Sequence, residues 1–167
     1  MCYNSAYEYG NEIVHEMKKL TIEDVTLEYT GNANPKIGVL RREDGFKEKD
    51  HSNEINVAEF LFNTFGGEIV LLKETIEDEN PDYRWNNRLW DLKSPNGTGN
   101  LGKLLKKGLS QIFKNPGGIV LDISSLKTDT TRIEHIITER MQTSMKHSVD
   151  VMIIRRNKLI KVLRYKK

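Results

Sequence analysis

The chain has 167 residues, of which 30% are charged and 37% are apolar, and its formal net charge is +2. This length suits one domain of ordinary size, and the composition excludes a fully disordered polypeptide. No apolar run approaches the ~20 residues of a membrane-spanning helix, and Cys2 is the single cysteine, which excludes an internal disulfide.

Positive charge is concentrated in the C-terminal two thirds of the chain. Residues 1–60 contain 7 Lys+Arg and 12 Asp+Glu, a net −5, whereas residues 61–167 carry a net +7. The basic part is where a polyanion such as nucleic acid would bind. The first residues lack a basic flank followed by an apolar core, so we expect no cleaved signal peptide and a cytoplasmic site of action.

Residues 1–52 form a predicted N-terminal extension without a clear structural pattern. Gly31, Pro35, Gly38 and Gly45 interrupt it. The segment VTLEYT, residues 25–30, fits a short strand. We place a boundary near residue 52 and expect one domain over residues 53–167.

Helices and strands alternate from that boundary onwards. Ser52 or Asn53 can cap a helix that runs to about Phe65 and ends at Gly66-Gly67. GEIVLLKE predicts a strand, and PDYRW and RLWDLKS predict two more. Residues 101–114 have the pattern of an amphipathic helix with Phe113 on the apolar side. IVLDIS predicts a buried strand, and residues 129–145 predict a third helix. VDVMIIR and LIKVLRY complete an α/β fold with a mixed sheet.

The hairpin at Asn86-Asn87 carries the candidate chemistry. A two-residue turn there places Asp82 opposite Asp91, with Arg84 and Lys93 on the same face. Like charges in facing positions destabilise a sheet, and a hard divalent cation such as Mg²⁺ would compensate. Lys93 could then stabilise a charged transition state or orient water. The alternative is a solvent-exposed face on which Lys93 and Arg84 neutralise the two acids.

A third acidic ligand could come from the preceding helix. Glu54 falls within the inward stripe of that helix, whereas Glu59 lies to one side. An inward glutamate is costly unless it is paired or binds a metal ion. The alternative for Glu54 is a favourable interaction with the helix dipole in the first turn.

Two basic surfaces are candidates for contact with a phosphate backbone. Lys103, Lys107, Gln111 and Lys114 lie on the polar side of the amphipathic helix, and Arg155 and Arg156 begin the last turn. A solvated helix face explains the lysines equally well.

These residues resemble a known family. Pro81-Asp82, eight residues and then Asp91-Leu92-Lys93 resemble the PD-(D/E)xK nuclease signature, and the helix with Glu54 and the αβββαβ order resemble its restriction-endonuclease-like core. More narrowly, residues 53–125 look like the C-terminal tRNA nuclease domains of contact-dependent growth inhibition toxins and of related phage or mobile-element proteins.

The resemblance implies phosphodiester hydrolysis with Mg²⁺ or Mn²⁺, often on tRNA. By position, Glu54, Asp82 and Asp91 take the metal-ligand roles, and Lys93 joins them as a catalytic residue. It also implies delivery from another cell and a possible cognate immunity protein.

Three other functions stay open from the sequence. The first is a metal-independent ribonuclease of the barnase/colicin type, built on His135 with Arg132 or Lys93. The second is a DNA endonuclease, and the third is a non-catalytic nucleic-acid-binding module. His15, His51, His135 and His147 have no metal-ligand spacing among them.

Overall fold

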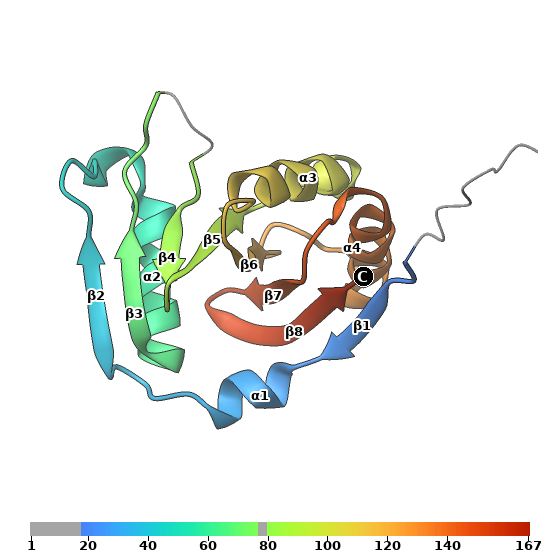
Figure 1. Ribbon diagram of the computed structural model, residues 1–167, viewed down its shortest axis with the longest axis horizontal. Helices are drawn as coiled ribbons and strands as arrows, with labels where there is room; N and C mark the ends of the chain where they lie inside the picture. The colour runs from blue at the N-terminus through green and yellow to red at the C-terminus, as the bar shows by residue number, and fades with distance from the viewer. Residues whose placement is uncertain (1–17, 77–79) are drawn as a thin grey trace, which may run out of the picture.

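The computed structural model describes residues 18–76 and 80–167, which form a single mixed sheet with helices on both faces (Figure 1). Across the sheet the strands follow the order β1-β8-β7-β6-β5-β4-β3-β2. No helix in these residues is long and apolar enough to cross a membrane. Cys2 and His15 lie outside the described residues.

The elements have the following bounds in chain order: β1 Thr21–Asp24, α1 Thr26–Gly31, β2 Gly38–Arg42, η1 Glu48–Asp50, α2 Ser52–Phe65, β3 Gly67–Leu71, β4 Tyr83–Trp85, β5 Arg88–Lys93, η2 Thr98–Asn100, α3 Leu101–Gln111, β6 Pro116–Asp122, α4 Thr130–Ser144, β7 Val149–Arg155 and β8 Lys158–Lys166.

The sheet lies between two hydrophobic cores. Helices α3 and α4 pack on one face against residues such as Ile119 and Ile153, and α2 packs on the other against Val120 and Met152. Alternate residues of β6 and β7 therefore enter opposite cores, as expected for strands covered on both faces. This confirms the predicted α/β fold with a mixed sheet, and the succession α2-β3-β4-β5-α3-β6 follows the predicted αβββαβ order.

Helix α2 matches its prediction in both bounds but not in its cap. It ends before Gly66, whose φ of 69° is accessible to glycine at little cost. The prediction that Ser52 or Asn53 caps the helix is wrong, because His51 precedes it and no side chain caps it. The Asn53 side chain instead donates to Ser94 Oγ at 3.1 Å, which joins the start of α2 to the end of β5.

The tight hairpin between β4 and β5 is confirmed. Asn86 and Asn87 have φ values of 49° and 64°, which a two-residue turn of this kind requires. Tyr83 pairs with Trp90 and Trp85 with Arg88, as the predicted register has it. The indole rings of Trp85 and Trp90 lie 5.1 Å apart in the core beneath α2.

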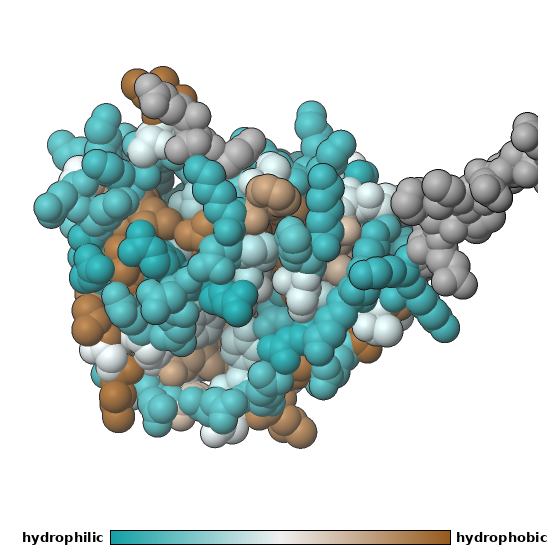
Figure 2. Space-filling view, in the orientation of Figure 1, coloured by the Kyte–Doolittle hydropathy of each residue, from teal (hydrophilic) through white to brown (hydrophobic). Residues whose placement is uncertain are grey.

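Residues of the predicted N-terminal extension contribute both edges of the sheet. Strand β1 pairs antiparallel with β8, and β2 pairs parallel with β3 at the opposite edge. The predicted boundary near residue 52 is therefore not a break in the sheet. Ile37, just before β2, is 68% exposed, and Val39 on β2 is 50% exposed. Figure 2 shows hydrophobic atoms along this side of the molecule.

The prediction of a strand at residues 25–30 is wrong, because Thr26–Gly31 is helix α1. The Asp24 carboxylate accepts a hydrogen bond from Thr26 N at 2.9 Å and from Thr26 Oγ1 at 2.6 Å, which turns the chain into the helix. Tyr29 then donates its hydroxyl proton to the buried Asp150 at 2.6 Å. Arg164 pairs with the same carboxylate, so the buried charge is satisfied and α1 is fastened to β7 and β8.

Helix α3 is shorter than predicted. It ends at Gln111, and Ile112 turns inward while Phe113 is 54% exposed. The prediction that Phe113 belongs to the core is therefore wrong. Helix α4 and the final hairpin are confirmed, with the turn formed by Arg156 and Asn157 at φ values of 49° and 55°.

Gly118 tests the packing of β6 between its neighbouring strands. A Cβ at this position would lie less than 3.0 Å from the Asp150 carbonyl oxygen and from the Trp90 ring. We expect Gly118→Ala to lower the free energy of unfolding by about 1–3 kcal/mol, measured by urea denaturation. Gly99→Ala is the matched control, since nothing lies within 4 Å of its added methyl group; equal destabilisation by both variants would contradict the packing.

Candidate active site

Asp91 is a buried carboxylate on β5 beneath helix α3. It is 1% exposed, and a Cβ added to Gly108 of α3 would lie 3.4 Å from its Oδ2 atom. Glycine in the middle of a helix costs about 1 kcal/mol relative to alanine, so this residue marks a close approach. The alternative of a solvent-exposed charged face is wrong for Asp91.

Asp82 is held beside Asp91 by the main chains of two strands. Its carboxylate accepts a hydrogen bond from Leu92 N at 2.7 Å, and its own N–H donates to the Trp90 carbonyl at 3.1 Å. The last strand pair of the hairpin is Tyr83 with Trp90. The sequence predicted that Asp82 and Asp91 form the next pair, and this prediction is wrong because the strand pairing stops before them. Their carboxyl groups nevertheless interact closely enough for each to change the acidity of the other.

Burial and mutual repulsion favour the protonated form of this pair. Removal from water, followed by the charge of Asp91, raises the pKa of Asp82 to about 8, against the hydrogen bond from Leu92 N. Burial also raises the pKa of Asp91, although the Lys93 ammonium opposes that shift. The surroundings of the site therefore stabilise less negative charge than two ionised carboxylates would carry.

Lys93 links the acidic pair to helix α3. Its Nζ lies 2.6 Å from Asp91 Oδ2 and donates to Gln111 Oε1 at 2.7 Å, and its side chain is 11% exposed. Gln111 Nε2 in turn donates to the Asn80 carbonyl at 3.1 Å. An ammonium group has three N–H donors, so one is left for a further acceptor. The contact of Asn80 with Gln111 and the close approach of Gly108 to Asp91 were not predicted from the sequence. A glycine inside the apolar pattern of a helix could have indicated the close approach.

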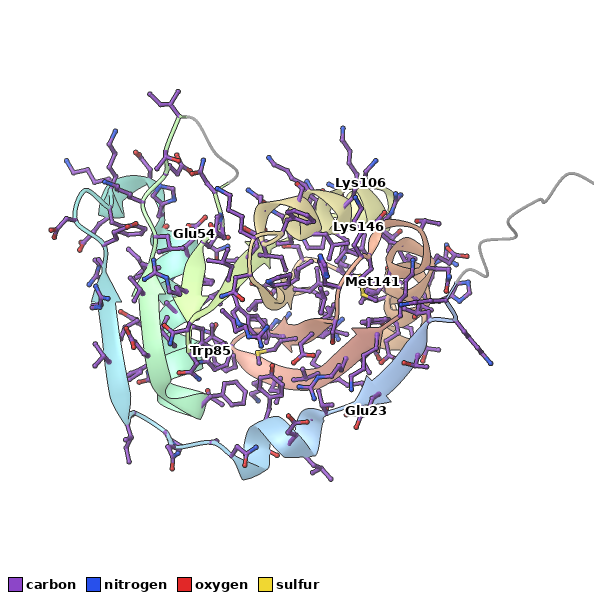
Figure 3. All side chains as sticks on the ribbon, viewed as in Figure 1. Glu23, Glu54, Trp85, Lys106, Met141 and Lys146 are labelled. Carbon is purple, nitrogen blue, oxygen red and sulfur yellow. The ribbon has the colours of Figure 1, made fainter. Side chains whose placement is uncertain are left out.

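Glu54 lies at the same end of the sheet but further from Asp91. It is half-buried at the start of α2, and its negative charge contributes to the raised pKa of Asp82. His51 Nδ1 lies 3.7 Å from its carboxylate, a contact that was not predicted. Glu59 is exposed, so of the two helix acids Glu54 is the one that acts on the acidic pair. Figure 3 shows Glu54 within the part of the molecule that α2 and β3 form.

The residues of this site fit a divalent cation in part. Both side-chain oxygens of Asp91 are buried; Oδ2 is paired with Lys93 Nζ, whereas Oδ1 accepts no well-formed hydrogen bond and could bind a cation. Within residues 18–76 and 80–167, no three His, Cys, Asp or Glu side chains are close enough together to hold a metal ion. Mg²⁺ commonly binds one or two carboxylates and fills its remaining coordination positions with water. Asp82 and Asp91 are therefore enough carboxylates for a Mg²⁺ site of this kind.

The predicted nucleic-acid-binding residues occupy different surroundings. Lys107 lies close enough to Asp91 to oppose the rise of its pKa, and Gln111 contacts Lys93, so both belong to the edge of the site. Lys103 and Lys114 are exposed. Arg155 Nη2 donates to the carbonyls of Leu126 and Thr128 at 3.5 Å, which fastens a loop, while Arg156 is exposed at the turn.

The raised pKa of Asp82 predicts how stability changes with pH. Between the ordinary pKa near 4 and the raised value, the folded state binds more protons than the unfolded state, so stability falls as pH rises through this window. With EDTA present, Asp82→Asn should therefore unfold with a free energy roughly 1–3 kcal/mol higher than the wild type at pH 8. The gain should vanish towards pH 4.

Urea denaturation across this pH range measures the effect. Asp44→Asn, at an exposed position, should change stability little at any pH. A variant Asp82→Asn that is less stable than the wild type at pH 8 would show that the buried pair is not repulsive.

Comparison with known proteins finds a likeness that begins just before Asp82. No curated protein matches the chain. A solved structure described as a CdiA-CT/CdiI toxin and immunity complex from Burkholderia pseudomallei aligns with a TM-score of 0.49 and 18% identity, over 73% of this chain and 98% of that chain. Residues 79–160, which contain Asp82, Asp91, Lys93 and Gln111, match the family model of the contact-dependent growth inhibition CdiA C-terminal domain. Over this stretch the chain is similar to that family.

Proposed function

We propose that this chain is a toxin domain of the contact-dependent growth inhibition type and that it hydrolyses phosphodiester bonds as a metal-dependent nuclease. The observation that carries the proposal is Asp91, a buried carboxylate that is paired with Lys93 and lies next to the carboxylate of Asp82. A fold keeps such an arrangement at a cost in stability, which is typical of functional sites. The match of residues 79–160 to the CdiA C-terminal family supports a toxin.

Asp82 and Asp91 would hold Mg²⁺ or Mn²⁺, and Glu54 would complete the site directly or through a water molecule. When bound, the cation would neutralise the two acids, polarise a phosphoryl oxygen and lower the pKa of a coordinated water. Asp82 is fixed by Leu92 N and by Trp90 O, so its carboxylate needs little reorganisation to act as a ligand.

Lys93 would act on the phosphate group. Its ammonium is oriented by Gln111 and Asp91, which leaves one N–H to donate to a non-bridging phosphate oxygen. In hydrolysis the water oxygen forms a bond to phosphorus as the bond to the leaving oxygen breaks, and negative charge grows on the non-bridging oxygens. A donor held in place beforehand stabilises that charge.

We propose tRNA as the substrate, with DNA as the alternative. The net +7 of residues 61–167, the exposed Lys107 beside Asp91 and the exposed Lys103 on the same helix suit a polyanion. The preference for tRNA rests on the resemblance of residues 53–125 to tRNA nuclease toxins. Delivery into a target cell, action in its cytoplasm and neutralisation by a cognate immunity protein belong to the same proposal.

The described residues favour the metal-dependent reaction over the barnase/colicin-type alternative. His135 is 71% exposed and pairs with Glu139 on its own helix, 3.2 Å away. Arg132 is exposed as well. A general base for ribonuclease chemistry is expected within reach of a bound substrate and of a partner that orients it, and His135 has no such setting.

Cleavage assays with and without metal test the proposed reaction. We expect the wild-type chain to cleave total tRNA with Mg²⁺ or Mn²⁺ and to lose this activity in EDTA, with recovery when the metal is restored. Plasmid DNA should be cleaved far more slowly. Undiminished cleavage in EDTA would favour the metal-independent ribonuclease, and cleavage of neither nucleic acid would contradict a nuclease.

Substitutions at the site test the assigned roles. Asp91→Ala and Lys93→Met should each lower the cleavage rate roughly 10²-fold or more, because each removes a group that acts on the reacting phosphate. Glu54→Gln should lower it more than Glu59→Gln, since only Glu54 influences Asp82. Asp44→Asn is the control for loss of an exposed carboxylate. Full cleavage by Asp91→Ala would contradict the role of Asp91, whereas a toxic phenotype that survives Asp91→Ala in the absence of cleavage would indicate a non-catalytic module.

A further inference from the structure

We propose that a cavity between α3 and α4 binds an unpaired nucleotide of the nucleic acid, separately from the acidic site. The inference rests on the proposed function only in taking the bound nucleic acid to be the substrate. The cavity has a volume of about 640 Å³, which lies within the range of ligand pockets. Its walls come from the C-terminal parts of both helices and from the segment that leads into β7.

An exposed aromatic ring lines this cavity. Phe113 is 54% exposed, directly after the inward-facing Ile112, and its ring lies 5.8 Å from the imidazole of His147. More than half of the Phe113 surface is therefore accessible for stacking on another flat group. Every nucleic-acid base offers such a face, and base–aromatic stacking tolerates any sequence.

Basic groups surround the ring. Lys146 Nζ lies 6.0 Å from the centre of the Phe113 ring, and Lys106 and Arg140 line the same cavity. Figure 3 shows Lys106 and Lys146 near each other beside α3. No Asp or Glu lines the cavity among the residues that the structure describes. Cations around an apolar, aromatic floor match a nucleotide, which has an apolar base and an anionic phosphate.

The shape and polarity of the cavity favour a nucleotide over an acidic protein partner. A base inserted beside Phe113 would contact the half-buried side chains of Leu109 and Pro116, and the Ser110 hydroxyl, which donates to Lys107 O, could accept a hydrogen bond from its edge. An acidic protein surface would meet the basic rim but would leave this apolar floor without a flat partner. Duplex bases are already stacked, so single-stranded or looped nucleic acid is the expected occupant.

Binding of a short, fluorescently labelled single-stranded RNA, measured by anisotropy in EDTA, tests the inference without cleavage. Phe113→Ala should weaken binding roughly 5- to 100-fold, the loss expected for one stacked base. Phe113→Trp should retain it. The double variant Lys106→Gln/Lys146→Gln should reduce the magnitude of the slope of log K against log salt by about 1.4, at about 0.7 for each lysine on a single strand.

Matched controls remove similar side chains elsewhere on the surface. Leu27→Ala removes an apolar group that is 85% exposed on α1, and Lys19→Gln removes an exposed charge. Neither should change RNA binding appreciably. If the wild type does not bind the RNA, or if Phe113→Ala binds as tightly as Leu27→Ala, the nucleotide site is overturned and the cavity is left to other partners.

Cleavage with Mg²⁺ separates this inference from the proposed function. RNA binding that depends on Phe113, without cleavage by the wild type, would support the nucleotide site and overturn the nuclease. Metal-dependent cleavage by the wild type, combined with RNA binding that Phe113→Ala does not weaken, would support the nuclease and overturn the nucleotide site.

Discussion

The interaction between the buried carboxyl group of Asp91 and the half-buried carboxyl group of Asp82 is the constraint on which the site depends. Burial raises the pKa values of both, the charge of Asp91 raises the pKa of Asp82 further, and Asp91 Oδ1 accepts no well-formed hydrogen bond. A fold can retain such a pair only if the surrounding structure holds it in place. Here the main chain of β5 fixes Asp82, and α3 closes over Asp91 at Gly108.

The same arrangement explains how one side of the molecule could prepare a phosphate site. Lys93 lies between the carboxylate of Asp91 and the amide of Gln111, so its position is set by a strand and a helix together. Elements that are rigid on both sides leave the ammonium little freedom, which favours stabilisation of charge as it develops. Stability lost to the acidic pair is offset by the two cores that cover the sheet.

Local signals in the sequence were sufficient for the central hairpin and for α2. Asn86-Asn87 accepts positive φ at both positions, so it fixed the pairing of Tyr83 with Trp90 and placed Asp91 and Lys93 on one face. Gly66 likewise fixed the end of α2. These features depend on residues close in sequence, which is why periodicity and turn chemistry could predict them.

Features that depend on distant residues were missed. Helix α1 is six residues long, and its Tyr29 hydroxyl donates a hydrogen bond to Asp150, which is distant in the sequence. The sequence does not reveal this contact, and the β-branched residues of this segment favoured a strand instead. The pairing of β1 and β2 with opposite edges of the sheet has no local signal. Phe113 continues the apolar spacing of α3, but the helix ends at Gln111 and the ring turns outward. Lys93 meets Gln111 because two long side chains cross between separate elements, which spacing along the chain does not encode.

Anomalous X-ray diffraction from crystals equilibrated with Mn²⁺ would test most directly whether the acidic pair is a metal site. A metal-dependent nuclease requires an anomalous peak bonded to carboxylate oxygens of both Asp82 and Asp91, and loss of that peak in crystals of Asp91→Ala. Absence of Mn²⁺ from the pair, in crystals of a chain that still cleaves nucleic acid, would contradict this assignment of the site.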